Sequence, residues 1–600
     1  MKISREWLQT FFDAPLPEAN ELAHALTFHA FEIESIENDI LDVKVTPNRG
    51  HDCLSHRGIA KELAAILNIP MTKDPFGADK GGQFDMSATI TVSVADAALC
   101  PRYIAWAIKG VKVGPSPDWL KRRLESIGER SINNIVDATN YVMFTLGQPL
   151  HAFDADMLKV KNPKIRGTTE YAVGVRLAKA GEKITSLDGK VYELSESNLL
   201  IVKGESDEPV GIAGVKGGMN SGVSDETRDL VIESANFNGV SVRKTSQALK
   251  LRTSASQRFE QVLAPELAAF GMRSVAALIR ELAGGELAGF ADVYPSPQEK
   301  TKVSVSLTHI NECLGTSLSA TDVEDAFTRL ALSFEGDKNI FTVESPPERL
   351  DLNIPEDLVE EVGRIVGYDK VPTTELPELK QKTEVNENFY AAEKAREELI
   401  SLGYSEVITS VFADKGERVV ANKVDGVRPY LRATLIDGLK EAHERNARNK
   451  DLLGLDEVKL FEIGIAWKKG KELFMLGMAD KKGVKEKELE SSAARAYDEL
   501  PTSKTEHYQP FSKYPHISRD IALWVPKGTS ADEVFDVIKH HAGGLLVRSW
   551  KFDEFAKGDK VSYAFRLVFQ SPDRTLFDGD ANERMESIYM AVKEKGWEVR

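Results

Sequence analysis

The chain has 600 residues, about four times the ~150 residues of an average domain, so several separately folded units are expected. Apolar residues make up 42% and charged residues 28%, which excludes a disordered or fibrous chain. The formal net charge of −16 argues against a protein that coats DNA or anionic lipid through bulk electrostatics. Any nucleic acid must therefore be bound locally.

Cysteine usage and hydropathy indicate the compartment. Cys53, Cys100 and Cys313 lie far apart and form no CxxC pair, so neither a disulfide framework nor a thiolate zinc site is expected. The N-terminal MKISREWLQTFF carries charges within its apolar pattern, and no run of about 18 apolar uncharged residues occurs. We therefore expect a cytoplasmic protein with no membrane partner and no DNA partner.

An internal repeat appears when residues 1–70 are laid over residues 303–372. In each copy, helix-like segments precede a strand-like segment, LDVKVTPNR or FTVESPPER, and another helix follows. We expect two copies of one small helix and strand domain, at residues 1–75 and 300–372. Chance similarity between amphipathic segments is the alternative.

The second copy carries four carboxylates that the first copy mostly lacks. Asp357, Glu360 and Glu361 are spaced i, i+3 and i+4 on one helical turn, and Asp351 lies just before it. Counted equally from Asp52, the first copy has instead Gly58, Lys61 and Glu62. Carboxylates this close repel one another unless a hard divalent cation neutralises them, so the pattern favours magnesium. A solvated helix start that complements the helix dipole is the alternative.

Residues 88–290 contain strands, helices and several glycine-rich turns, which predicts an α+β domain. Five polar residues lie inside apolar runs and form either a structural hydrogen-bond network or a pocket: Asn133, Asn134, Asp137, Thr139 and Asn140. Gly211, Gly214, Gly217 and Gly218 would let the backbone approach a ligand closely. His151 and Glu233 could recognise a hydroxyl group as donor and acceptor, although a lone histidine is more often structural.

The C-terminal part begins with helices and short strands over 375–480, and residues 481–510 have little apolar periodicity, which suggests a linker. Residues 511–600 follow the order βαββαβ, typical of a ferredoxin-like domain. This segment has 14 basic and 14 acidic residues, so residues 1–510 hold the whole net charge. Such a charge balance is compatible with RNA contact or with protein docking, and the ferredoxin-like fold alone does not distinguish these two functions.

Six motifs together resemble the editing domain of the bacterial phenylalanyl-tRNA synthetase beta subunit family: CPRY, PSPDWLKRRLESIGERSINNIVDATNYVM, GQPLHAFD, TSLDG, IAGVKGG and RTSASQRFE. The likeness extends to TPNRGHDCLSHRGIAKELAAI, to PPERLDLNIPEDLVEEVGRIVGYDKVP, to YLRATLIDGL with LFEIG, and to YPHISRDIAL with SPDRTL. It implies a multidomain α+β chain in a heterotetramer of two alpha and two beta subunits, which joins phenylalanine to its tRNA with ATP and magnesium.

The resemblance also implies roles for the domains. The alpha subunit would hold the site of ligation, so residues 375–480 would form a class II synthetase-like, non-catalytic domain packed against alpha. Asp351, Asp357, Glu360 and Glu361 match the magnesium positions of the family. The ferredoxin-like domain at 511–600 resembles the family's anticodon-binding domain.

The resemblance further implies hydrolysis of tyrosine wrongly attached to the tRNA. His151 and Glu233 match the residues that hold the tyrosine hydroxyl. The pocket wall would consist of Thr139, Asn140, Ala213, Gly214, Gly217, Thr253 and Ala255. No nucleophile system of the metal-bound or Ser–His–Asp type is visible, which favours a water positioned by the backbone and by the terminal tRNA hydroxyl.

Several departures from the family pattern bear on function. The family usually carries an oligonucleotide-binding barrel between the segments FEIESIEN and DILDVKVTPNR, which abut here, and the class II-like domain is shortened. Lys216 stands where methionine is typical, and QVLAPELA replaces the usual RGVDP. We therefore expect weaker binding of tRNA and a perturbed pocket. The alternatives are a structural, tRNA-binding subunit with an inactive pocket and a stand-alone trans-editing hydrolase.

Overall fold

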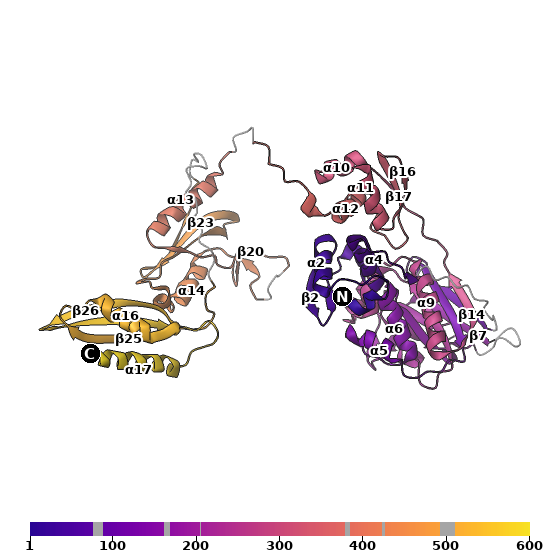
Figure 1. The fold of residues 1–600 in the computed structure, drawn as a ribbon, viewed down its shortest axis with the longest axis horizontal. Helices are drawn as coiled ribbons and strands as arrows, with labels where there is room; N and C mark the ends of the chain where they lie inside the picture. Colours follow the sequence, from indigo (N-terminus) through magenta and orange to yellow (C-terminus); the bar gives the residue numbers. More distant parts are fainter. Residues whose placement is uncertain (76–87, 161–168, 205, 379–383, 423–426, 492–509) are drawn as a thin grey trace. The chain divides into compact units, whose positions relative to one another are not determined.

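The computed structural model describes residues 1–75, 88–160, 169–204, 206–378, 384–422, 427–491 and 510–600. The chain divides into two compact units, Met1–Leu376 and Pro377–Arg600, and each is described by itself (Figure 1). Within these described ranges, no helix is both long and apolar enough to cross a membrane.

The predicted repeat is confirmed, because both copies have the same order of elements and the same sheet. The first copy contains β1 Lys2–Ser4, α1 Arg5–Gln9, α2 Ala19–His29, β2 Ile33–Glu37, β3 Ile40–Val43, the 3₁₀ turn η1 Pro47–Arg49, α3 Gly50–Cys53 and α4 His56–Leu67. The second contains β15 Lys302–Ser306, α10 Leu307–Leu314, α11 Ala320–Arg329, β16 Ser333–Gly336, β17 Ile340–Glu344 and α12 Pro355–Val366. The strand orders β1-β3-β2 and β15-β17-β16 are equivalent.

Local chemistry explains why the copies fold alike. Ser4 and Ser306 end the first strand of each copy, and each hydroxyl accepts a hydrogen bond from a backbone N–H in the following helix. In the first copy Asn38 and Asp39 join β2 to β3 with φ of 49° and 63°. Asparagine and aspartate tolerate this left-handed conformation, which matches the two-residue turn of a tight hairpin. The hairpin therefore closes directly between the segments FEIESIEN and DILDVKVTPNR.

The middle domain contains two large sheets, the small hairpin β8-β9 and a layer of helices. Its elements are β4 Ala88–Val94, β5 Arg102–Lys109, α5 Asp118–Ser126, α6 Asn134–Leu146, β6 Leu150–Asp154, η3 Ala155–Leu158, β7 Thr169–Leu177, β8 Lys183–Thr185, β9 Val191–Glu193, β10 Leu199–Lys203, β11 Pro209–Ile212, β12 Lys216–Gly217, η4 Met219–Ser221, β13 Asp229–Asn236, α7 Gly239–Ala248, α8 Ser254–Phe259, α9 Leu267–Ala283 and β14 Glu286–Val293. One sheet has the order β12-β11-β10-β7-β4 and the other β14-β5-β13-β6.

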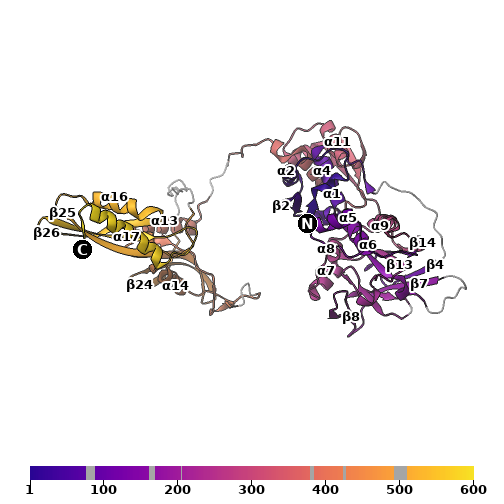
Figure 2. The ribbon, with the colours of Figure 1, turned by 60° about the horizontal axis from the view of Figure 1, so that its bottom comes forward.

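Alternation along β5 and β13 divides the core of this domain into two layers. Tyr103 and Ala105 face the first sheet, whereas Ile104 and Ile108 pack with residues of α6 and α9. Figure 2 shows α6 and α9 beside β13 and β14. Polar side chains on the inner face of β13 are therefore enclosed between two sheets.

The second unit begins with a small domain around an antiparallel hairpin. It contains α13 Glu387–Ser401, β18 Ser405–Glu406, β19 Phe412–Ala413, β20 Arg418–Val419, β21 Tyr430–Leu431, α14 Ile436–Ala447, α15 Lys450–Leu453, β22 Leu460–Lys468, β23 Lys471–Asp480 and β24 Gly483–Glu488. Strand β24 pairs with β23, so the predicted linker over 481–510 begins too early. The sequence of β24 alternates lysine with glutamate and has no clear apolar face, so hydrophobic periodicity does not predict this strand. Residues 492–509 of that linker lie outside the described residues.

The last domain has the predicted ferredoxin-like order. Its elements are β25 Ile517–Pro526, α16 Ala531–Ala542, β26 Leu546–Lys557, β27 Lys560–Phe569, α17 Asp578–Glu594 and β28 Glu598–Val599, and the sheet order is β26-β27-β25-β28. Ile521 and Leu523 of β25 point to the core with α16 and α17. Trp524 lies on the opposite face, which no helix of this domain covers.

Candidate functional site

His151 and Glu233 come from neighbouring strands and lie side by side at a cavity in the middle domain. His151 of β6 is the direct partner of Glu233 of β13 in the antiparallel register, so both side chains leave the same face of the sheet. Val231 and Ala235, which flank Glu233 on that face, belong to the core between the two sheets. Glu233 is only 6% exposed, so its chemistry is that of a buried group.

The cavity has a volume of about 260 Å³. Seven of the nine predicted pocket residues line it: His151, Glu233, Asn140, Gly214, Gly217, Thr253 and Ala255. Thr139 and Ala213 do not line the cavity. The Thr139 hydroxyl donates to the Val136 carbonyl at 2.7 Å, and Ala213 is buried in the core. The sequence motifs therefore bring most, but not all, of the predicted wall together.

Gly214 and Gly217 of the pocket wall lie so close to neighbouring side chains that no larger residue fits. A Cβ on Gly217 would lie 2.6 Å from Cε1 of His151, which is closer than atoms can pack. Gly214 has a φ of +69°, and its Cβ would meet Val242 at 2.8 Å. Only glycine fits these positions without moving His151 or the backbone.

The protonation of the two polar groups follows from their burial. Burial lowers the pKa of His151 to about 4, so the imidazole is neutral at neutral pH. Burial also raises the pKa of Glu233 to about 7, although a hydrogen bond from Tyr103 acts in the opposite direction. Nε2 of His151 is buried with no hydrogen-bond partner among the described residues. An unpaired buried group of this kind is suited to a polar atom of a ligand.

The polar residues of the SINNIVDATN segment mostly form a structural network. The Asn133 side chain caps α6, and that of Asn134 donates to the carbonyls of Lys112 and Leu282. Asp137 accepts hydrogen bonds from Ser116 and Ser131 and from the backbone. Of the five residues, only Asn140 lines the cavity, so the segment serves chiefly to fix the start of α6.

Lys216 also lines the cavity, but its ammonium group forms an ion pair with Asp188. Its Nζ lies 2.9 Å from Oδ2 of Asp188, which lies in the turn between β8 and β9. The backbone N–H of Leu187 in the same turn donates to the Gly217 carbonyl. The lysine therefore joins this hairpin to the pocket rim and does not project as a free charge.

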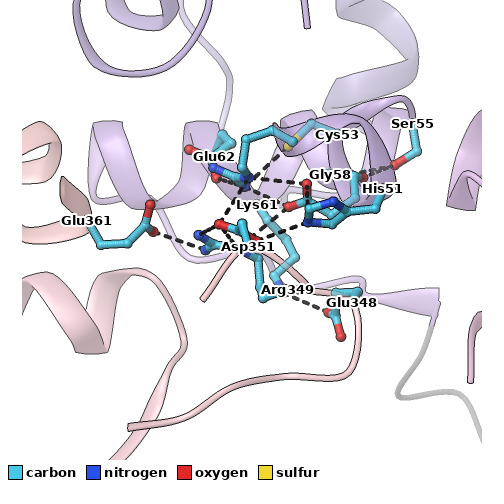
Figure 3. Close-up of polar contacts among 12 residues, drawn as sticks. His51, Cys53, Ser55, Gly58, Lys61, Glu62, Glu348, Arg349, Asp351 and Glu361 are labelled. Atoms are coloured by element: carbon cyan, nitrogen blue, oxygen red, sulfur yellow. Dashed lines mark hydrogen bonds and ion pairs between the residues drawn. The ribbon is translucent and has the colours of Figure 1, made fainter. Parts of the chain in front are cut away.

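The four carboxylates of the second repeat line another cavity, of about 400 Å³. Figure 3 shows Arg349 between two of them, with Nη2 2.6 Å from Asp351 Oδ2 and Nη1 3.0 Å from Glu361 Oε2. Asp357 accepts the backbone N–H groups of Asn353 and Ile354 at the start of α12. Glu360 is exposed on the next turn.

The arginine pairs repeat across the two copies. Arg49 binds Asp52 and Glu62 in the first copy, as Arg349 binds Asp351 and Glu361 in the second. Arg364 then lies between the copies, 2.5 Å from Glu62 and 2.6 Å from Glu361. Burial alone would raise the pKa of Glu62, but Arg364 and Arg49 together lower it, so the carboxyl stays ionised.

The carboxylates differ in how well they fit a divalent cation. Among the described residues, one group of three ligand atoms lies within 4.8 Å, namely Asp52, Cys53 and Glu62, and Arg49 already binds it. Asp351 and Glu361 are likewise held by arginine, whereas Asp357 and Glu360 have no ion pair in the described part of the chain. Mg²⁺ retains several waters and often takes one or two carboxylates, so these two residues fit it.

Comparison with known proteins agrees with this geometry. Family models match residues 99–284 as a B3/4 domain, 303–368 as a tRNA synthetase B5 domain and 512–600 as a ferredoxin-fold anticodon binding domain. The chain is similar to the phenylalanine–tRNA ligase beta subunits of Carboxydothermus hydrogenoformans (32% identity), Thermotoga maritima (31%) and Clostridium acetobutylicum (33%). Each match covers 94% of this chain and 80% of the relative.

The chain belongs to the family of phenylalanine–tRNA ligase beta subunits. A beta subunit acts with an alpha subunit and with tRNA, and the C-terminal match names an anticodon-binding fold.

In this beta subunit, the small domain before the ferredoxin-like domain contains a buried arginine, Arg432, that forms an ion pair with a glutamate of the same domain. Nη1 of Arg432 lies 2.6 Å from Oε1 of Glu462 and also donates to the Thr409 hydroxyl.

Several neighbours of the predicted site residues in this beta subunit are not apparent from the sequence. Tyr103 donates to Glu233 at 2.8 Å, and Glu129 lines the same cavity. The spacing of Tyr103 in CPRY, inside a strand that pairs with the Glu233 strand, is a signal that could have found it. Arg349 and Arg364 pair with Glu361 of the second copy, and Arg364 also pairs with Glu62 of the first copy, a partner about 300 positions away that the sequence does not reveal.

Proposed function

We propose that this beta subunit hydrolyses tyrosine wrongly esterified to phenylalanine tRNA. The observation that carries the proposal is the buried pair of His151 and Glu233 at one cavity. A phenol hydroxyl would donate to the Glu233 carboxylate, while Nε2–H of His151 would donate to the phenol oxygen. Phenylalanine would leave Nε2 of His151 unpaired and Glu233 with Tyr103 as its one donor, which is the costly mismatch that gives strong discrimination.

The reaction adds water across the ester. The water oxygen bonds to the carbonyl carbon, the bond from that carbon to the ribose oxygen breaks, and the ribose oxygen takes the proton. The residues of this chain bind and orient the aminoacyl group, and the close glycine wall at Gly214 and Gly217 brings backbone next to the ester. Lys216 does not block this role, because its ammonium group is held by Asp188.

The test is to assay the chain assembled with its alpha subunit against Tyr-tRNA and Phe-tRNA. His151→Ala and Glu233→Ala should slow Tyr-tRNA hydrolysis at least tenfold and leave phenylalanine attachment nearly unchanged. Wild-type enzyme that never deacylates Tyr-tRNA would instead support a structural subunit with an inactive pocket. Hydrolysis by the chain alone, with no association to alpha, would support a trans-editing hydrolase.

We infer that the assembly holds two alpha and two beta chains in the cytoplasm, and that residues 375–480 supply the alpha surface. Large apolar side chains are exposed across this domain, and Ile408 is 92% exposed. Ile400, Leu402 and Val419 are also exposed, which is unusual for a surface that faces only water. Light scattering of the mixed subunits gives the stoichiometry, and Ile408→Glu should weaken association.

We also propose that this sheet face of the last domain contacts tRNA bases around Trp524, away from the end where Arg566 pairs with Asp451 of α15. Trp524 and Phe555 lie on this face with ring centroids 6.1 Å apart, and the Arg600 guanidinium lies over both rings. Exposed aromatic rings with arginine stack on unpaired bases. Trp524→Ala should therefore raise KM for tRNA by about tenfold, a loss of roughly 1–3 kcal/mol per stacked base. An unchanged KM would remove this face from the tRNA contact.

Magnesium and ATP belong to the ligation that the assembled enzyme performs. In this chain, Asp357 and Glu360 are the residues that would hold a magnesium ion, since arginines hold Asp351 and Glu361. A bound cation would neutralise the two remaining carboxylates at the start of α12. Removal of magnesium should therefore loosen this turn, which hydrogen exchange of residues 353–362 can measure.

A further inference from the structure

We propose that Tyr103 is a positioning residue of the pocket, which holds one oxygen of Glu233 so that the other faces the cavity as an acceptor. The inference rests on the proposed function, because the acceptor is needed only for a ligand with a phenol hydroxyl. It concerns specificity for tyrosine over phenylalanine and not the hydrolytic step itself.

The strand register places Tyr103 and Glu233 as diagonal neighbours. Tyr103 of β5 is the direct partner of Ala235 of β13, two residues beyond Glu233 on the same face. Diagonal partners on paired strands lie about 7–8 Å apart, which a tyrosine side chain can span. The Tyr103 hydroxyl donates to Oε2 of Glu233 at 2.8 Å, and both side chains are buried.

The carboxylate separates Tyr103 from the ligand space. Glu233 lines the cavity, whereas Tyr103 is not among the residues that line it. Within the described part of the chain, Tyr103 is the only side chain that donates to Glu233, and Glu233 has no ion pair there. The orientation of this carboxylate therefore depends on one hydroxyl group.

The charged and titratable groups near Glu233 do not replace that hydroxyl. Cys100 precedes β5, and burial raises the pKa of its thiol, so it stays neutral. His151 is neutral at neutral pH, and Lys216 is paired with Asp188. Glu129 also lines the cavity, and its carboxyl accepts a hydrogen bond from the Ser254 hydroxyl. The hydrogen bond from Tyr103 is therefore the interaction that favours the ionised, accepting form.

This arrangement predicts a specific kinetic signature. Without the Tyr103 hydroxyl, Glu233 loses a donor that lowers its pKa, so a higher pH is needed to ionise it. A hydrogen bond to a charged group is worth about 1.5–3 kcal/mol, which corresponds to a shift of at least about one pH unit. Ionised Glu233 accepts the ligand hydroxyl, so the effect should appear in KM for Tyr-tRNA and not in kcat.

The test compares Tyr103→Phe with Tyr171→Phe in the chain assembled with its alpha subunit. Tyr171 is a matched control, because its hydroxyl is also buried between the two sheets and has no partner among the described residues. For Tyr103→Phe, the rising limb of kcat/KM should move up by about one pH unit, and KM for Tyr-tRNA at pH 7 should rise about fivefold, because the ionised fraction of Glu233 falls from about half to about a tenth. At pH 9 the wild-type KM should return, and Tyr171→Phe should show neither change.

Three experimental outcomes would overturn the proposed role of Tyr103. A Tyr103→Phe enzyme with an unchanged pH limb and only a lower Tm would make Tyr103 a structural residue and overturn the inference. A wild-type enzyme that fails to hydrolyse Tyr-tRNA overturns the proposed function and the inference together. If Tyr103→Phe does not fold, Glu233→Gln provides the second measurement: its kcat/KM for Tyr-tRNA should lose the limb near pH 7, and a retained limb would overturn the inference.

Discussion

Glu233 makes the stability of the middle domain depend on pH in an unusual direction. Burial raises the pKa of this carboxyl from 4.5 to about 7, so the native state holds its proton more tightly than the unfolded chain does. The native state therefore has its full stability below pH 4.5, and loses this contribution as the pH rises through 7. A shift of about 2.5 units corresponds to roughly 3 kcal/mol at pH 8.

Replacing Glu233 by Gln removes this penalty and keeps an acceptor for the Tyr103 hydroxyl. At pH 8 the variant should exceed the wild type by about 3 kcal/mol in the free energy of opening, whereas at pH 4.5 the two should be nearly equal. The measurement is native-state hydrogen exchange of peptides from 229–236 and 102–109, corrected for the intrinsic rate at each pH. Glu208→Gln, at an exposed site paired with Lys203, serves as the control.

Two parallel stability profiles for wild type and Glu233→Gln would refute the reasoning. They would mean that the carboxyl ionises in the native state at its ordinary pKa, despite its burial between two sheets. The proposed role of Glu233 as an acceptor near neutral pH would then not depend on Tyr103.

Three further predictions concern the ion pairs. Arg364→Met removes the cation between Glu62 and Glu361 and should lower the free energy of unfolding of residues 1–376 by about 3–5 kcal/mol, measured by urea titration; a loss below 1 kcal/mol would contradict this. Lys216→Met breaks a half-exposed pair worth at most about 1 kcal/mol, so exchange of residues 183–193 should quicken no more than about fivefold; a larger change would show that the lysine holds the hairpin in place. Asp357→Asn with Glu360→Gln should weaken Mg²⁺ binding about tenfold in calorimetry with little loss of stability, and Glu361→Gln should do the opposite, whereas equal effects would reject this division of roles.

The fold was largely predictable because its signals are local. The repeat, the ferredoxin-like order and the strands of the middle domain all follow from hydrophobic periodicity and capping serines. The strand at 483–488 was missed because its alternation is lysine with glutamate and valine, so it has no clear apolar face. A tertiary partner, β23, determines this strand and its own propensity does not.

The pocket was partly predictable for a different reason. His151 and Glu233 could be named from motifs, but their direct opposition depends on the register between β6 and β13. The family resemblance predicts Thr139 in the pocket wall. In the structure the next residue of α6, Asn140, lines the cavity, whereas the Thr139 hydroxyl donates to the Val136 carbonyl. The arginine pairs across the two repeats could not be foreseen, because residues about 300 positions apart meet only in the folded chain.

The Asn38–Asp39 turn has a consequence for how this family changes in size. Paired strands lie about 5 Å apart, so the two ends of β2 and β3 form a junction that any domain with adjacent termini could occupy. Closing a loop costs free energy only as the logarithm of its length, and the strands on either side keep their own pairing. A whole domain can thus be gained or lost at this hairpin as a single event, without altering the register of the repeat or the pairs that Arg49 makes.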